Sequence, residues 1–200
     1  MADTDTDTGT TPTPRRTRYE FRVWGEHRKA CKLLSRIGTD ETRESIEDCY
    51  LIVDDPSYNA KVRDCSLKVK ELVDTRKGFE CWESTWHESA DGAPSPFDDL
   101  FDDLRLDKPA RGKRYDFPKA VKKLDDDAPR PVFVTKRRRR YRVGGIRAES
   151  TEIRIKGTCE RLHTLAIEGD DLESLVALRK ELGLKKGENL PVHRAIEAEL

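Results

Sequence analysis

Short segments in which polar and apolar residues alternate run through most of the chain. In the first of them, residues 19–24, Tyr19, Phe21 and Val23 fall on one face and charged residues on the other. A period of two is typical of a β-strand with one buried face. The same pattern predicts further strands at residues 45–53, 59–64, 67–73, 78–86, 131–143, 148–156 and 162–168.

Two segments instead carry apolar residues at helical spacing. Residues 26–37 are predicted as a helix that ends at Gly38. A second helix is predicted from Asp170 to Gly183, with Asp170 as N-cap and Glu173 completing a capping box. Residues 117–124 resemble a short helix, and residues 190–200 are expected to pack back onto the domain.

The chain therefore divides into a tail and one domain. Residues 1–16 are almost all small or polar, so we expect a disordered N-terminal tail. Residues 17–200 suit a single domain, interrupted by an acidic loop at about 88–114 that is rich in Asp, Pro, Gly and Ser.

Composition narrows the function classes. Charged residues make up 39% of the chain, yet 39 basic side chains balance 39 acidic ones. A general nucleic-acid coat protein would show a basic excess, so any polyanion site must arise from local segregation of charge. The five cysteines form no C-x-x-C pair, and the chain shows no signal peptide or long apolar run. A cytoplasmic protein without a membrane partner is expected.

The polar faces of the strands are unusual because they carry Lys and Arg in pairs two residues apart. Adjacent strands lie about 5 Å apart, so such pairs would crowd like charges unless something negative compensates for them. A solvated sheet face is the alternative interpretation. Arg and Lys also suit phosphate contacts. The candidate phosphate-binding residues are Arg22, Lys61, Arg63, Lys68, Lys70, Lys136, Arg138 and Arg140.

The run from Lys136 to Arg140 lies inside a predicted strand. Alternate members must then point to opposite sides of the sheet, so only about half of them can serve one site. A free basic run would instead indicate nucleic-acid binding.

The order of these motifs resembles the CYTH domain, the triphosphate tunnel family. Asp48 and Tyr50 match its D-x-Y strand, and Lys136 with Arg138 matches its K-x-R strand. Two basic strands lie between these motifs, and the segment TLAIEGDD, which contains Glu168, matches the turn into the last long helix. The resemblance spans about residues 19–184.

The resemblance implies an α+β fold, an antiparallel barrel-like β tunnel with flanking helices. It further implies that basic residues hold a triphosphate and that carboxylates bind Mg²⁺ or Mn²⁺. The corresponding metal-ligand candidates in this chain are Glu20, Glu80, Glu149 and Glu168. Members of the family hydrolyse triphosphates, remove RNA 5′-triphosphates or cyclise ATP.

The chain departs from the family pattern at the first strand, where E-x-E-x-K is expected. Glu20 fits the first position, but Arg22 stands at the second glutamate and Trp24 at the lysine. Ala166 likewise stands where the family often has a glutamate. Two expected carboxylates are therefore missing, which bears directly on metal-dependent catalysis.

Three functions remain open from the sequence. The first is binding of a triphosphate-containing polyanion with metal-dependent hydrolysis, which would make the chain a phosphoric anhydride hydrolase. The second is a non-catalytic module that binds polyphosphate or a phospho-ligand. The third is an RNA-end or single-strand RNA binder that uses the KRRRR strand and exposed tryptophans. Trp24, Trp82 and Trp86 could stack on a base, but half-buried packing is the favoured interpretation of these three residues. No residue shows a local nucleophile signature, so no catalytic residue is assigned.

Overall fold

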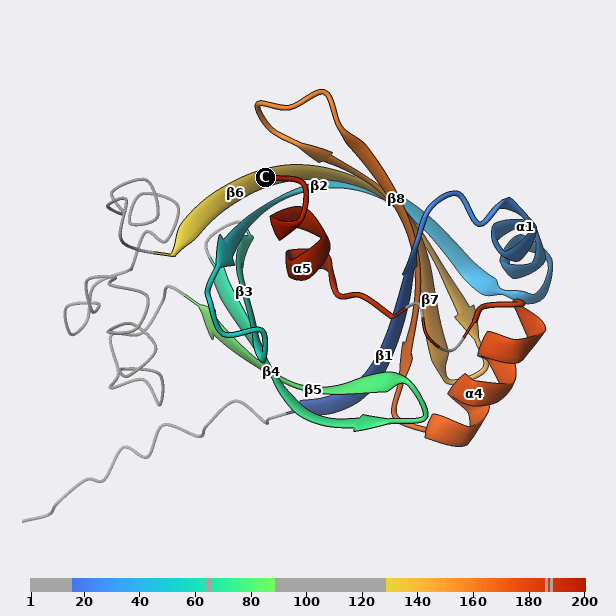
Figure 1. The fold of residues 1–200 in the computed structure, drawn as a ribbon. Coiled ribbons are helices and arrows are strands. Elements are labelled where there is room, and N and C mark those ends of the chain that lie inside the picture. The colour runs from blue at the N-terminus through green and yellow to red at the C-terminus, as the bar shows by residue number, and fades with distance from the viewer. Residues whose placement is uncertain (1–15, 64–65, 89–128, 186, 188) are drawn as a thin grey trace, which may run out of the picture.

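The computed structural model describes residues 16–63, 66–88 and 129–200 except 186 and 188. In this part of the chain, antiparallel strands close into a barrel in the order β1-β5-β4-β3-β2-β6-β7-β8 (Figure 1). The strands are β1 (Arg16–Trp24), β2 (Thr39–Ile52), β3 (Tyr58–Arg63), β4 (Ser66–Arg76), β5 (Phe79–Glu88), β6 (Arg130–Val143), β7 (Ile146–Ile155) and β8 (Arg161–Gly169). The helices are α1 (Arg28–Ile37), α4 (Leu172–Glu181) and α5 (Val192–Glu197). The predicted α+β fold, an antiparallel barrel with flanking helices, is confirmed.

Every strand that the alternation predicted is present. β2 is longer than predicted because it begins at Thr39, and its first residues pair with the far end of β6, as Thr42 does with Arg140. These residues are nearly all polar, so they give no alternation. The N-terminal tail, most of the acidic loop and the helix at 117–124 lie outside the described residues.

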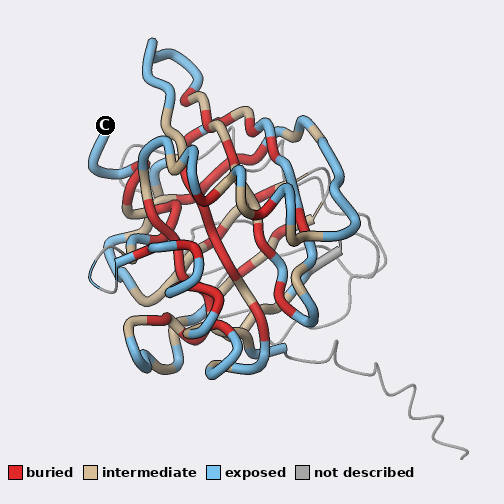
Figure 2. The backbone as a smooth tube through the Cα atoms, turned by 90° about the vertical axis from the view of Figure 1, so that its right-hand side faces the viewer, coloured by how far each residue is buried: buried red, intermediate tan, exposed pale blue. Residues whose placement is uncertain are grey.

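The main hydrophobic core lies on the outside of the barrel. Phe21 and Val23 of β1 point outward and pack with Leu34 of α1 and Leu175 of α4. Figure 2 shows buried positions running along the strands and exposed positions gathering at the turns. Since α1 and α4 cover the apolar faces of β1, β7 and β8, the charged faces of these strands line the interior.

The interior changes character along the barrel axis. On the inner face of β6, Val132 and Val134 precede Lys136, and they pack with Ile153, Val192 and other apolar residues. Seen along the axis, α5 lies within the ring of strands (Figure 1). The C-terminal helix therefore fills the apolar end of the barrel and leaves the charged end as a cavity.

Backbone and side-chain hydrogen bonds hold the segment before α5 against β1. The Leu190 amide donates to the Arg22 carbonyl at 3.1 Å, and the Trp24 indole donates to the Leu190 carbonyl at 2.7 Å. This confirms that the C-terminal segment packs back. No helix in the described ranges is long and apolar enough to cross a membrane.

Two helix ends differ in detail from the sequence prediction. The N-cap of α4 is Asp171, whose side chain accepts from the Glu173 amide, so the prediction of Asp170 was wrong by one residue. Asp170 instead pairs with Arg16 and Arg18. Gly38 does cap α1, but with an extended backbone. A side chain there would approach the Leu34 carbonyl to 2.7 Å, and this close contact explains the glycine.

Candidate functional site

All strands of the barrel contribute to one cavity of about 490 Å³ at its charged end. Ten of its lining side chains are Arg or Lys, and four are Asp or Glu. The lining residues include each of the predicted binding residues: Arg22, Lys61, Arg63, Lys68, Lys70, Lys136, Arg138 and Arg140. The charged strand faces therefore meet inside the barrel, not in bulk solvent.

The KRRRR run behaves as its position in a strand requires. Lys136, Arg138 and Arg140 line the cavity, whereas Arg137 and Arg139 are exposed on the outer surface. The chain as a whole is neutral, so the concentration of positive charge is a local property of the cavity.

Three of the cations share a single carboxylate. The buried side chain of Asp48 lies 3.3 Å from Lys61 Nζ, 2.6 Å from Arg63 Nε and 3.0 Å from Lys136 Nζ. Burial alone would raise the pKa of Asp48, but the hydrogen bond from Arg63 and the charges of the lysines lower it well below its usual value. Asp48 is therefore ionised, and this single carboxylate is shared by three basic side chains.

Burial and neighbouring charges shift the pKa values of the lysines. Burial, followed by the charge of Lys136, holds the pKa of Lys61 well below its ordinary value. Burial lowers the pKa of Lys136 to about 8, and burial with the charge of Lys70 lowers that of Lys68 to about 8. Lys68 forms no ion pair with any described carboxylate, and its Nζ lies 4.7 Å from the Trp86 ring centroid. Burial is the largest cause of all three shifts, and a neighbouring lysine adds to it at Lys61 and Lys68.

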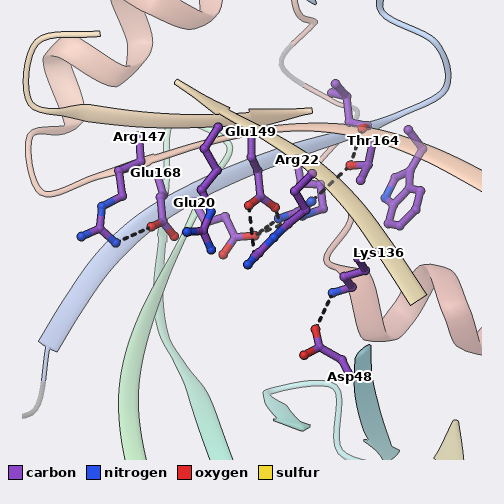
Figure 3. A network of polar contacts seen from close by, with 12 residues as sticks. Glu20, Arg22, Asp48, Lys136, Arg147, Glu149, Thr164 and Glu168 are labelled. Atoms are coloured by element: carbon purple, nitrogen blue, oxygen red, sulfur yellow. Dashed lines mark hydrogen bonds and ion pairs between the residues drawn. The ribbon is translucent and has the colours of Figure 1, made fainter. Parts of the chain in front are cut away.

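A second network crosses the opposite wall of the cavity (Figure 3). Arg22 Nη2 lies 3.1 Å from Glu20 Oε1 and 2.9 Å from Glu149 Oε1. Glu20 also accepts from Lys70 at 2.6 Å, and Glu149 lies 3.6 Å from Arg138 Nη1. Burial alone would raise the pKa of Glu149, but Arg22 and Arg138 lower it to about 2. Positive and negative side chains therefore alternate along this network, in the order Lys70, Glu20, Arg22, Glu149 and Arg138.

The resemblance implies a Mg²⁺ or Mn²⁺ ion, and the carboxylates of this cavity do not fit one. Both oxygens of Glu20 are engaged by Arg22 and Lys70. Glu168 accepts from Arg18 and Arg147. Among the described residues, no group of three His, Cys, Asp or Glu side chains is placed to hold a metal ion. A metal here would have to displace buried cations from their partners, which costs several kcal/mol.

The remaining metal candidate, Glu80, lies apart from the cavity. It faces Glu20 across the β1–β5 pair, and its carboxylate accepts from the Trp82 indole at 3.2 Å. Burial and the charge of Glu20 raise its pKa. Glu80 is not among the residues that line the cavity.

Some residues of the site were not assigned from the sequence. Glu44 lies 2.6 Å from Arg138 and 2.8 Å from Arg140, but it belongs to the part of β2 that showed no alternation. Arg147 and Arg142 also line the cavity. Arg147 is two residues before Glu149, so strand parity alone would have placed it on the inner face.

The three tryptophans have different surroundings. Trp82 is 2% exposed and packs edge-on against His193, and Trp24 is tied to the segment before α5. Trp86 is 39% exposed and lines the cavity. Only Trp86 remains available for stacking on a ligand.

Comparison with known proteins identifies the fold. No protein-family model and no curated protein sequence matches the chain. A conserved hypothetical protein from Pyrococcus furiosus has a similar structure, with a TM-score of 0.54, 19% identity, and 88% of this chain and 96% of that chain covered. A protein from Pyrococcus horikoshii has a TM-score of 0.52 and 16% identity, with 88% of this chain and 95% of that chain covered. A putative adenylate cyclase from Bacillus halodurans has a TM-score of 0.52 and 9% identity, with 93% of this chain and 98% of that chain covered.

These chains are covered almost completely, so the similarity concerns the whole barrel. The protein shares its closed antiparallel barrel fold with these chains, and this is the fold that the resemblance seen in the sequence implied. At these identities the comparison establishes the fold alone, and the function has to be argued from the cavity.

Proposed function

We propose that this protein binds a linear phosphate chain of the triphosphate class inside the barrel cavity. The observation that carries the proposal is the set of three cations, Lys61, Arg63 and Lys136, gathered around the single carboxylate of Asp48. Like charges at such distances repel one another, and a bound polyanion would relieve that repulsion.

The chemistry of the lining side chains suits a phosphate chain better than a single small anion. Arg63, Arg138 and Arg140 offer guanidinium groups that match pairs of phosphate oxygens, and the lysines offer point contacts. The cations come from several strands around the wall, so they suit a ligand that carries charge along its length. The name of the Bacillus halodurans neighbour, a putative adenylate cyclase, agrees with a triphosphate ligand.

The carboxylates favour binding without metal-assisted hydrolysis. Glu20, Glu149 and Glu168 are each held by cations of the chain itself. Of the functions that the sequence left open, a non-catalytic binding module therefore agrees best with the side chains present.

Isothermal titration calorimetry with tripolyphosphate tests the proposal. We expect one site per chain, with affinity falling in the order tripolyphosphate, pyrophosphate, orthophosphate. Arg138→Gln should weaken binding, because Arg138 lies inside the cavity. Arg137→Gln is the matched control, because this exposed neighbour in β6 faces away from the cavity. Equal weak binding of all three anions, or equal effects of the two variants, would refute the proposal.

Phosphate release measured in the same samples decides between binding and turnover. The non-catalytic form predicts no release with or without Mg²⁺ or Mn²⁺. Steady release that requires a metal and is lost in Glu149→Gln would instead establish a hydrolase.

Trp86 supports a second candidate ligand, a nucleoside triphosphate or an RNA 5′-triphosphate end. Its indole is exposed on the cavity wall, and stacking on a base contributes about 1–3 kcal/mol. ATP should then bind more tightly than tripolyphosphate and quench Trp86 fluorescence, and Trp86→Ala should remove that advantage. Equal affinities for ATP and tripolyphosphate would exclude a contribution from the base.

A further inference from the structure

We infer that the guanidinium of Arg22 takes the place of a divalent cation in this cavity, so that the protein binds its phosphate chain as the metal-free anion. The identity of the ligand rests on the proposed function. The statement about the metal does not, because it concerns side-chain contacts within the chain.

The first observation is the position of the guanidinium. Arg22 lies between two carboxylates and donates to Glu20 Oε1 through both Nε and Nη2, each at 3.1 Å. The same Nη2 donates to Glu149 at 2.9 Å, and Nη1 donates to the Thr164 hydroxyl at 3.3 Å. A cation bridged by two carboxylates is the arrangement that a divalent metal would otherwise adopt, and here the cation is covalently part of the chain.

The second observation is the residue that lies between these partners. Arg22 of β1 is directly opposite Ala166 of β8, and Ala166 is directly opposite Glu149 of β7. Neighbouring strands are about 5 Å apart, so Arg22 must reach across the whole width of β8 to meet Glu149. The methyl group of Ala166 leaves that path open, whereas a longer side chain would occupy it.

The two carboxylates that are missing from the family pattern, at Arg22 and Ala166, are thus neighbours in space. A carboxylate at position 22 or at position 166 would lie close to the carboxylates of Glu20 and Glu149. Such a group of like charges on adjacent strands is destabilising unless a cation such as a metal ion lies among them. Arg22 with Ala166 removes both expected carboxylates and supplies the missing positive charge. The lost side chains and the fixed cation therefore compensate for each other.

A divalent ion would have to compete with this arrangement. If it bound Glu20 and Glu149, the buried guanidinium would lose both partners and lie beside a double positive charge. A polyanion meets no such obstacle, because it approaches a wall that already carries excess positive charge. Solution Mg²⁺ should then weaken binding, since it neutralises the ligand that the cavity recognises.

Direct metal binding tests the inference without any phosphate ligand. Free Mn²⁺ is measured by electron paramagnetic resonance while the full chain is titrated up to about 1 mM Mn²⁺, a range that covers ordinary carboxylate sites. We expect no stoichiometric Mn²⁺ on the natural chain and one Mn²⁺ per chain on Arg22→Glu. Arg137→Glu, with the same charge reversal on the outer surface, should not gain a site.

A calorimetric titration with tripolyphosphate in EDTA and in excess Mg²⁺ completes the experiment. Binding to the natural chain in EDTA, made weaker by Mg²⁺, supports the inference. One tightly bound Mn²⁺ on the natural chain, binding of tripolyphosphate only with Mg²⁺, or a folded Arg22→Glu chain without Mn²⁺ would overturn it.

The two proposals fail in different ways. If tripolyphosphate binds in neither buffer but the Mn²⁺ results are as expected, the phosphate ligand is wrong and the role of Arg22 stands. Circular dichroism shows whether Arg22→Glu folds. If it does not, the Mn²⁺ titration of the natural chain decides, since one Mn²⁺ per chain overturns the inference and none supports it.

Discussion

Replacing Lys61 by Met separates a ligand-binding role from a structural role for the cavity cations. Lys61 lies on the inner face of β3, with its side chain 15% exposed and its Nζ 3.3 Å from Asp48. Arg63 and Lys136 contact the same carboxylate. Methionine keeps the unbranched apolar stem and removes the charge. Asp48 remains paired because Arg63 and Lys136 still contact it.

The expected magnitudes follow from these contacts. Asp48 then pairs with two cations in place of three, and the cost of burying the Lys61 ammonium beside Lys136 disappears. We expect the free protein to gain about 0.5–1 kcal/mol in its free energy of unfolding, as when a functional charge is removed from a crowded site. The ligand loses one charge-assisted contact of about 1.5–3 kcal/mol, which weakens tripolyphosphate binding about 10- to 100-fold.

Urea unfolding at pH 7 and calorimetric titration with tripolyphosphate measure the two effects. Lys32→Met on α1 is the matched control, because Lys32 is exposed outside the barrel and should change neither value by more than about 0.5 kcal/mol. A Lys61→Met protein that is less stable and binds with unchanged affinity would refute the reasoning. Lys61 would then be a structural partner of Asp48 and not a ligand contact.

Three further predictions concern the same cavity. Asp48→Asn leaves three cations without a carboxylate and should cost about 3–5 kcal/mol in urea unfolding, and tripolyphosphate at about 100 times its Kd should restore roughly 2.7 kcal/mol. The affinity for tripolyphosphate should fall as the pH rises from 7 to 9.5, because Lys68 and Lys136 have pKa values of about 8 and lose their protons in that range. Calorimetric titration at both pH values measures this, and an unchanged affinity would contradict it. Ile196→Ala in the buried face of α5 should cost about 2–5 kcal/mol in urea unfolding with little effect on affinity, and an equal loss of binding would show that α5 shapes the site.

The free protein should respond to pH in the opposite sense. The pKa of Lys136 in the folded chain is lower than in the unfolded chain, so between these values the unfolded chain binds more protons. That difference makes the folded state more stable as the pH rises above about 8, while ligand binding weakens. Opposite trends of stability and affinity distinguish crowded cations from ordinary ion pairs.

The fold could be predicted from the sequence because alternation is a local property. Tyr19, Phe21 and Val23 identify the outer face of β1 without any other part of the chain. The start of β2 at Thr39 was missed because its first residues are polar and exposed on both faces of the strand, so polar and apolar residues do not alternate there. The N-cap was displaced by one residue because Asp170 and Asp171 are adjacent, and only the structure shows which carboxylate meets the Glu173 amide.

The site could be predicted only in part because it depends on closure of the barrel. The sequence places Lys136 and Arg138 on one face of β6, but a flat sheet would turn that face toward solvent. Pairing of β1 with both β5 and β8 is what turns it inward. The path from Arg22 past Ala166 to Glu149 needs the register of three strands, which no single segment of sequence contains.

Protection of lysines from acetylation tests most directly whether cations of separate strands bind one phosphate chain inside the barrel. The full chain is treated with acetic anhydride with and without saturating tripolyphosphate, and modification is quantified by mass spectrometry. The account predicts that tripolyphosphate slows acetylation of Lys61, Lys68, Lys70 and Lys136 and leaves Lys32 and Lys180 unchanged. Acetylation of the four cavity lysines at the same rate with and without tripolyphosphate would contradict it.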